Sequence, residues 1–131
     1  MTVERVPDMK RILVAEDRAA GREWARAVLS HGGYEVILAC DGLEAVAKAR
    51  TESPDLVILD LRMPGLDGFE TLRTLRADER FTSTPFLAFT ANAMQGDRER
   101  AMAEGFDGYV SKPVSIAGLR AEVERLLILR T

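Results

Sequence analysis

The sequence predicts an α/β fold in which helices cover both faces of a doubly wound, five-stranded parallel sheet. Five short apolar runs recur along the 131 residues, helix-length segments separate them, and four of the runs are apolar throughout. A strand without polar alternation is typical of a sheet that is covered on both faces. Strands that alternate with helices form parallel sheets with right-handed crossovers. The length fits a single domain.

The five expected strands are short, and the last is the weakest. They are Ile12 to Ala15, Val36 to Ala39, Leu56 to Leu59, Phe86 to Phe89, and Tyr109-Val110.

Apolar side chains at helical spacing mark three of the helices that connect or follow the strands. These side chains are Trp24, Val28 and Leu29; Phe69, Leu72 and Leu75; and Ile116, Leu119, Val123, Leu126 and Leu127. The last set predicts a helix over about 115–129. Another helix is predicted to begin at Asp41-Gly42 and to end at Ser53-Pro54.

The segment between the fourth and fifth strands, ANAMQGDRERAMAEG, predicts a helix with few large apolar residues, led by Met94 and Met102. Gly96 lies inside or near its first turn, where glycine weakens a helix. Two interpretations stay open: a loosely held, solvated face, or a movable face that binds a partner.

Composition narrows the class of protein. The net charge is −3 and no Lys/Arg run occurs, so neither nucleic acid nor an acidic membrane surface is an expected partner. The first ten residues lack the apolar stretch of a signal peptide, and no run reaches the ~18 residues of a membrane span. The single cysteine, Cys40, cannot form an internal disulfide and is expected to be a small buried residue. We expect a cytoplasmic domain.

Polar residues follow the expected strands where each one ends. Glu16 and Asp17 follow the first, Asp60 the third and Thr90 the fourth, while the fifth leads to Lys112. The carboxyl ends of parallel strands meet at one edge, where ligands of open α/β sheets bind. Crowded carboxylates repel one another, and a hard cation such as Mg²⁺ relieves the repulsion. Threonine and lysine add donors suited to phosphate.

Taken singly, these residues have ordinary structural explanations. An aspartate after a strand is commonly a turn former, Thr90 alone suits a helix N-cap, and Lys112 alone suits the surface. Their coincidence at four strand ends favours a site that carries a phosphoryl group on a carboxylate.

The segments ILVAEDR, PDLVILDLRMPGLDGFE, FLAFTANA and GYVSKPV resemble, in order and spacing, the receiver domains of two-component response regulators, the CheY-like superfamily. The resemblance covers about residues 10 to 129. It implies the flavodoxin-like (βα)5 fold with strand order 2-1-3-4-5. It also implies an N-terminal extension over 1–9 and a receiver domain over 10–131.

The resemblance implies that Asp60 accepts a phosphoryl group from a phosphohistidine of a partner. Asp17 and Asp60 would bind Mg²⁺ directly, the backbone carbonyl of Arg62 would be the third protein ligand, and Glu16 would act through a water molecule. Pro64, Gly65 and Gly68 would turn the chain away from Asp60.

Thr90 and Lys112 would hold phosphoryl oxygens, and Tyr109 matches the switch aromatic that turns inward when Thr90 moves. The Lys112–Pro113 peptide bond is commonly cis in the family.

Arg62 and Asn92 would flank the route of hydrolytic water. An arginine there shields the acyl phosphate, attracts a partner or simply faces solvent. His31, the only histidine, is expected at the end of the first helix rather than as a phosphorylation site.

The implied partners are a sensor histidine kinase or a histidine phosphotransfer protein, and a downstream protein that binds the face of the fourth helix, fifth strand and last helix. The chain would be a monomer or a phosphorylation-dependent dimer. No enzymatic activity is implied beyond self-phosphorylation and autodephosphorylation at Asp60.

Two alternatives remain open. The chain could be a receiver domain excised from a hybrid histidine kinase or a larger regulator. An aspartyl-phosphate phosphatase of the haloacid-dehalogenase type is disfavoured, because it needs an aspartate where Arg62 stands. The nucleotide-binding motifs GxxxxGK and GxGxxG are absent.

Overall fold

The computed structural model describes residues 9–91 and 93–130. Most of the expected N-terminal extension, residues 1–8, and Asn92 lie outside the described residues. The strands and helices alternate along the chain, with one short 3₁₀ helix after α3. They are β1 (Arg11–Ala15), α1 (Ala19–His31), β2 (Glu35–Ala39), α2 (Gly42–Glu52), β3 (Leu56–Leu59), α3 (Gly68–Arg76), the 3₁₀ helix (Glu79–Phe81), β4 (Phe86–Thr90), α4 (Asp97–Glu104), β5 (Gly108–Ser111) and α5 (Ile116–Arg130).

The five strands form one parallel sheet in the order β2-β1-β3-β4-β5, which confirms the predicted fold class and strand order. Every residue of β3 and β4 is buried, as their continuous apolar sequences predict. β2 lies at an edge and is only half buried along most of its length. The predicted strand bounds agree with the structure to within one residue at each end.

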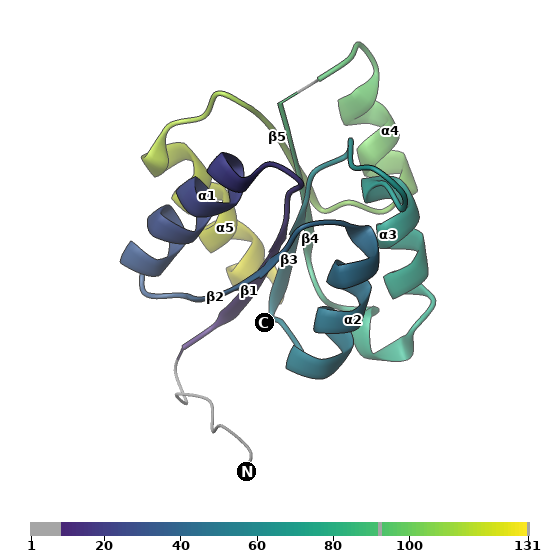
Figure 1. The fold of residues 1–131 in the computed structure, drawn as a ribbon, viewed down its shortest axis with the longest axis horizontal. Helices are drawn as coiled ribbons and strands as arrows, with labels where there is room; N and C mark the ends of the chain where they lie inside the picture. Colours follow the sequence, from purple (N-terminus) through teal and green to yellow (C-terminus); the bar gives the residue numbers. More distant parts are fainter. Residues whose placement is uncertain (1–8, 92, 131) are drawn as a thin grey trace.

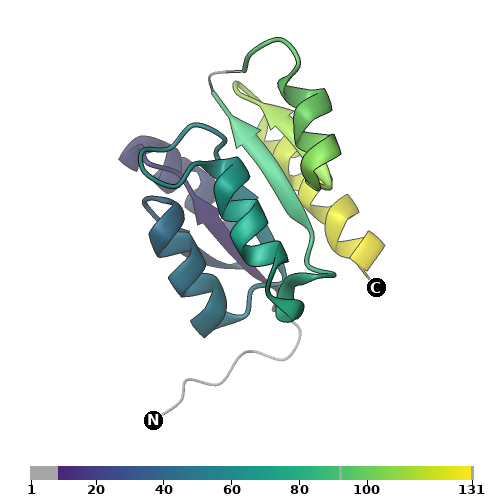
Figure 2. The ribbon, with the colours of Figure 1, turned by 90° about the vertical axis from the view of Figure 1, so that its right-hand side faces the viewer.

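Helices cover both faces of the sheet. Helices α1 and α5 lie on one face, and α2, α3 and α4 lie on the other (Figures 1 and 2). Two apolar clusters fill the spaces between these layers, one on each side of the sheet. Alternate residues of a strand therefore enter different clusters: Leu13 packs toward α2 and α3, and Val14 packs toward α1 and α5. None of the helices in the described ranges is long and apolar enough to span a membrane.

Local sequence signals set the ends of α2 as predicted. The side chain of Asp41 accepts a hydrogen bond from the amide of Glu44 at 2.8 Å, which caps the start of the helix. Ser53 takes the left-handed conformation, with φ of 50°, and ends the helix before Pro54. His31 is the last residue of α1, as expected.

Gly96 lies next to the first turn of α4, as expected: it is the N-cap of the helix, with φ of 87°, and shapes the turn that leads into α4. One expectation needs correction. Cys40 is exposed rather than buried. It follows the last residue of β2 and precedes the N-cap Asp41, where the chain has already left the sheet. Met94 and Met102 are also exposed, so they do not anchor α4.

Candidate functional site

The residues predicted from the strand ends all lie at the carboxyl edge of the sheet. Ala15 of β1 pairs with Leu59 of β3, so Glu16 and Asp60, one residue further along, leave the sheet together. The amide of Asp60 continues this pairing by donating to the Ala15 carbonyl at 3.1 Å. On the other side, the Lys112 amide donates to the carbonyl of Thr90 at 2.9 Å. The sheet register therefore brings the predicted residues together.

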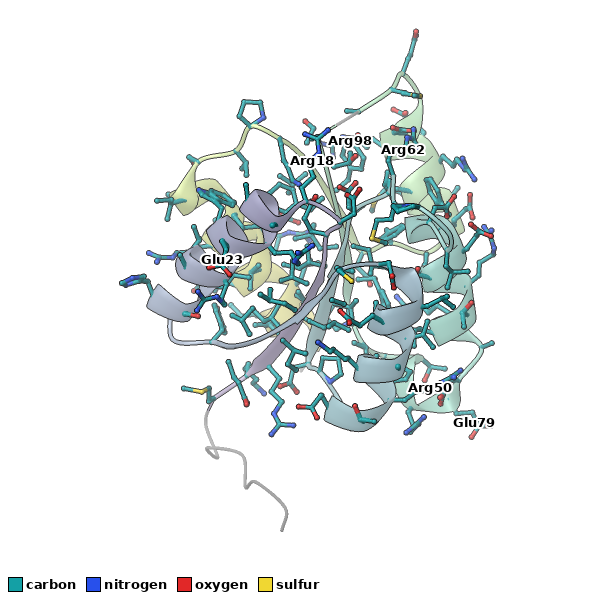
Figure 3. The ribbon with its side chains drawn as sticks, viewed as in Figure 1. Arg18, Glu23, Arg50, Arg62, Glu79 and Arg98 are labelled. Carbon is teal, nitrogen blue, oxygen red and sulfur yellow. The ribbon has the colours of Figure 1, made fainter. Side chains whose placement is uncertain are left out.

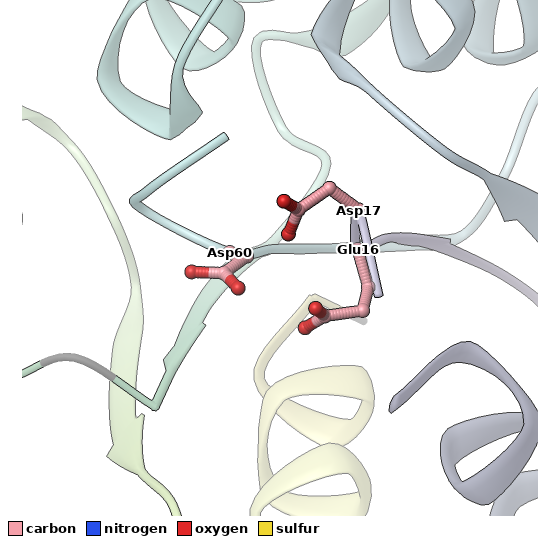
Figure 4. A group of neighbouring side chains, drawn as sticks. All are labelled: Glu16, Asp17 and Asp60. Atoms are coloured by element: carbon pink, nitrogen blue, oxygen red, sulfur yellow. The ribbon is translucent and has the colours of Figure 1, made fainter. Parts of the chain in front are cut away.

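Three carboxylates gather at this edge (Figure 4). One oxygen from each of Glu16, Asp17 and Asp60 lies within 4.8 Å of the other two. Glu16 and Asp60 are buried, whereas Asp17 is exposed. Such a set of hard oxygen donors, with two members shielded from water, suits a small divalent cation.

Lys112 supplies the nearest cation. Its Nζ bonds to the carboxylate of Glu16 and lies 4.0 Å from Oδ2 of Asp60. It also lies 4.7 Å from the centre of the Phe89 ring, so an aromatic face supports the ammonium group. The Lys112–Pro113 peptide bond is cis, as the resemblance implies.

The two buried carboxylates differ in their electrostatics. Burial raises the pKa of Asp60 to about 6, and the neighbouring charge of Glu16 adds to this rise. Burial also raises the pKa of Glu16, but hydrogen bonds from Lys112 and from the Arg18 amide outweigh burial and leave the pKa below its ordinary value. Glu16 thus takes most of the stabilisation that Lys112 offers, and Asp60 is left as a destabilised anion.

Thr90 is fully buried at the end of β4, and its hydroxyl has no hydrogen-bond partner among the described residues. Buried hydroxyl groups rarely lack a partner, so an acceptor placed here would gain a ready donor. Tyr109 is also buried and packs on the side of the sheet that α4 covers, together with Ala101. The guanidinium of Arg98 lies 5.0 Å from the centre of its ring.

The loop after Asp60 turns back tightly. Gly65 has φ of 73°, which favours glycine. Gly68 begins α3 so close to the loop that a Cβ atom there would lie 2.5 Å from the Asp60 carbonyl oxygen and 2.8 Å from Cα of Leu61. The two glycines thus allow the tight turn of the loop and the close approach of α3 to Asp60.

Arg62 does not face solvent freely. Its Nη2 lies 2.8 Å from both carboxylate oxygens of Asp97, the first residue of α4. Asp97 is buried, and the sequence did not single it out. Nothing in the local sequence indicates that Asp97 has a partner 35 residues away. The position of the Arg62 carbonyl as a metal ligand stays a prediction.

A pocket of about 350 Å³ opens beside Lys112. Its lining is mostly apolar and comes from α1, β4 and the segment after β5: Ala20, Gly21, Trp24, Phe89, Lys112, Pro113 and Val114. Trp24 was expected in the first apolar stripe, but it is partly exposed and packs on Phe89 with a ring-centre distance of 6.1 Å.

Comparisons with known proteins agree with this geometry. The family model of the response regulator receiver domain matches residues 12–124. The polar-differentiation response regulator DivK of Brucella ovis is 37% identical over 107 residues, which cover 82% of this chain and 87% of that protein.

Two solved structures are also similar to this chain. The receiver domain of the sensor histidine kinase PA1611 from Pseudomonas aeruginosa, with a magnesium ion in its active-site cleft, is 37% identical with a TM-score of 0.84 and covers 91% of this chain and 98% of that one. The chemotaxis protein CheY4 of Vibrio cholerae is 31% identical with a TM-score of 0.85 and covers 90% and 98%.

Proposed function

Because the chain belongs to the response regulator receiver domain family of two-component signalling, we propose that Asp60 accepts a phosphoryl group from a phosphohistidine and thereby controls binding of a partner protein. The observation that carries this proposal is the placement of Asp60. It lies beside Glu16 and Asp17, within 4.0 Å of the Lys112 ammonium, at the edge where Thr90 ends β4.

The donor set fits Mg²⁺. The carboxylates of Asp17 and Asp60 and the carbonyl of Arg62 would hold the ion, and Glu16 would act through a water molecule. The magnesium ion in the cleft of the similar receiver domain of PA1611 supports this choice. When bound, Mg²⁺ supplies positive charge that offsets the crowded carboxylates and the phosphoryl oxygens.

In the proposed transfer, an oxygen of the Asp60 carboxylate forms a bond to phosphorus while the bond from phosphorus to the histidine nitrogen of the partner breaks. The imidazole keeps the electron pair of that bond and takes a proton from solvent. No additional base is required, since Asp60 reacts as an anion. Lys112 and the unpaired hydroxyl of Thr90 would hold phosphoryl oxygens, and positioning and charge neutralisation carry most of the catalysis.

The proposed role is that of a signalling module in the cytoplasm, with no enzymatic activity other than self-phosphorylation and autodephosphorylation. Its upstream partner is a histidine kinase or a histidine phosphotransfer protein. Its output passes through the face of α4, β5 and α5, which includes the switch residue Tyr109.

The similarity to DivK along most of that protein supports a separate response regulator. The similarity to the receiver of PA1611 supports the second candidate, a receiver of a hybrid kinase.

The direct test compares wild type with Asp60→Asn. Incubation with acetyl phosphate and Mg²⁺ should label wild type, and base or hydroxylamine should release the label, as expected of an acyl phosphate. Asp60→Asn removes the nucleophilic carboxylate and should remain unlabelled, whereas His31→Gln, at the end of α1, should be labelled like wild type. Mass spectrometry that places the label on His31 or on another aspartate would refute the assignment.

A further inference from the structure

Helix α4 has unusually few apolar anchors for an element on the proposed output face. It has eight residues, and only Asp97 and Ala101 of these are buried. Ion pairs also hold α4 against the rest of the domain. Arg62 holds Asp97 at the start of the helix, and Arg73 bonds to Glu104 at its end.

The two ion pairs differ in burial. The side chain of Asp97 is 7% exposed and that of Arg62 is 29% exposed, whereas the side chains of Glu104 and Arg73 are 25% and 55% exposed. An ion pair that is shielded from water is screened less and costs more to break from one side. The pair at the start of α4 is therefore the stronger tether.

Asp97 also closes the turn that leads into α4. Its Oδ2 accepts a hydrogen bond from the Met94 amide at 2.8 Å, and its own amide donates to the Met94 carbonyl at 3.0 Å. Whatever holds the Asp97 carboxylate thus holds both this turn and the first turn of α4.

Arg62 connects this turn to the candidate phosphorylation site. Its amide donates to Oδ1 of Asp60 at 3.1 Å, while its guanidinium holds Asp97 (Figure 3 shows Arg62 on the α4 side of the molecule). Its Nε is buried without a hydrogen-bond partner among the described residues. One residue therefore bonds to the phospho-acceptor through its main chain and to α4 through its side chain.

We propose that Arg62 is a positioning residue whose ion pair with Asp97 holds the start of α4 in its phosphate-free position and opposes the rearrangement of α4 on phosphorylation. This inference rests on the proposed function, because it concerns the regulation of the same site. By linkage, an interaction that is present only in the phosphate-free state lowers the affinity of the site for a phosphoryl group. Removal of the pair from either side should therefore raise that affinity.

The first measurement is amide hydrogen exchange without Mg²⁺ or any phosphoryl analogue. Arg62→Gln, Asp97→Asn and the double variant should each speed exchange in residues 93–100 by roughly tenfold, and the double variant should not exceed the single ones by more than a small factor. Arg73→Gln is the matched control, because it removes the exposed pair at the other end of the same helix and should leave residues 93–100 unchanged. Unchanged exchange in the two single variants overturns the proposal.

The second measurement is the affinity for beryllofluoride with Mg²⁺. Both single variants should bind it several-fold more tightly than wild type, whereas a purely structural role would weaken binding or leave it unchanged. A gain in only one variant would assign the effect to that side chain alone and overturn the coupling. Failure of wild type itself to bind beryllofluoride at Asp60 would instead overturn the proposed function, and the exchange measurement distinguishes the two failures.

Discussion

At the scale of single residues, the fold disfavours the charged form of the Asp60 carboxylate. Burial and the charge of Glu16 raise the pKa of Asp60 from its ordinary 3.8 to about 6. The folded state then binds more protons at Asp60 than the unfolded state does between these two pH values. Folding stability consequently decreases as the pH rises through this window.

We therefore predict that Asp60→Asn stabilises the protein in the presence of a chelator at pH 7. The expected gain in unfolding free energy is on the order of 2 kcal/mol. It should shrink as the pH falls from 7 toward 4, because Asp60 becomes protonated in the folded state and increasingly so in the unfolded state. Urea denaturation of both proteins from pH 4 to 7.5 measures it. Excess Mg²⁺ should shrink the gain, because a cation offsets the carboxylate charge. An equal stability difference at every pH would contradict the electrostatic cause.

A second residue-scale prediction concerns Asp17 and uses Trp24 as the reporter. Trp24 packs on Phe89, whose ring faces the Lys112 ammonium, so a charge change at the site reaches the indole through two contacts. Titration with Mg²⁺ should change the fluorescence of wild type, and Asp17→Asn should weaken binding by at least tenfold, because it removes a carboxylate that we propose coordinates the ion directly. Glu23→Gln, an exposed change on α1, serves as the control. Equal Mg²⁺ affinity in wild type and Asp17→Asn would contradict the ligand assignment.

At the scale of elements, the start of α3 controls the shape of the acceptor loop. A Cβ atom at Gly68 would collide with the backbone of Asp60 and Leu61, which cannot move aside as a flexible side chain can. We predict that Gly68→Ala destabilises the protein by about 1–3 kcal/mol and weakens beryllofluoride binding.

Gly65→Ala is the matched variant in the same loop. Its φ of 73° disfavours alanine, but a Cβ atom there meets nothing within 4 Å. It should cost about 1 kcal/mol and leave beryllofluoride affinity close to that of wild type. Thermal unfolding and fluorescence titration measure both effects. If the two variants behave alike, backbone conformation rather than close approach determines the loop.

Elements also differ in how well the sequence predicts them. The central strands β1, β3 and β4 are continuous apolar runs because both of their faces are covered, so their bounds could be predicted closely. Their order in the sheet could not, because an apolar run does not identify its neighbours; the order came from the resemblance. The exposure of Cys40 was missed because it depends on where the chain leaves an edge strand.

The residues of the candidate site also differ in how well the sequence predicts them. Those at or just after the strand ends could be predicted, since parallel strands bring their carboxyl ends to one edge. The ion pair of Arg62 with Asp97 could not, because it joins the loop after β3 to the start of α4, and tertiary packing sets that contact. The unpaired hydroxyl of Thr90 likewise required the packing of β4 to be known.

At the scale of the whole molecule, we predict how phosphorylation spreads. Thr90 ends β4 at the site, and Tyr109 packs in the same cluster as Ala101 of α4. Since α4 has few apolar anchors, its rearrangement breaks few apolar contacts. Hydrogen exchange of wild type with beryllofluoride should change mainly in residues 93–112. Thr90→Ala should remain phosphorylatable at Asp60 but lose most of this change and of the difference in partner affinity, whereas Thr82→Ala, on the opposite edge, should retain both. A response confined to the surroundings of Asp60 would favour a simple phosphate relay.

The contact between Glu16 and Lys112 spans 96 positions of the chain. A ribosome synthesises Glu16, Asp17 and Asp60 well before β5, so the three acidic residues precede their cationic partner. Contacts of such long range form late, because the loop between them must first be closed. Competence to receive a signal is thus among the last properties that the growing chain acquires. The upstream kinase should not phosphorylate a nascent or truncated chain that lacks β5. Phosphorylation would then occur only on a domain that has finished folding.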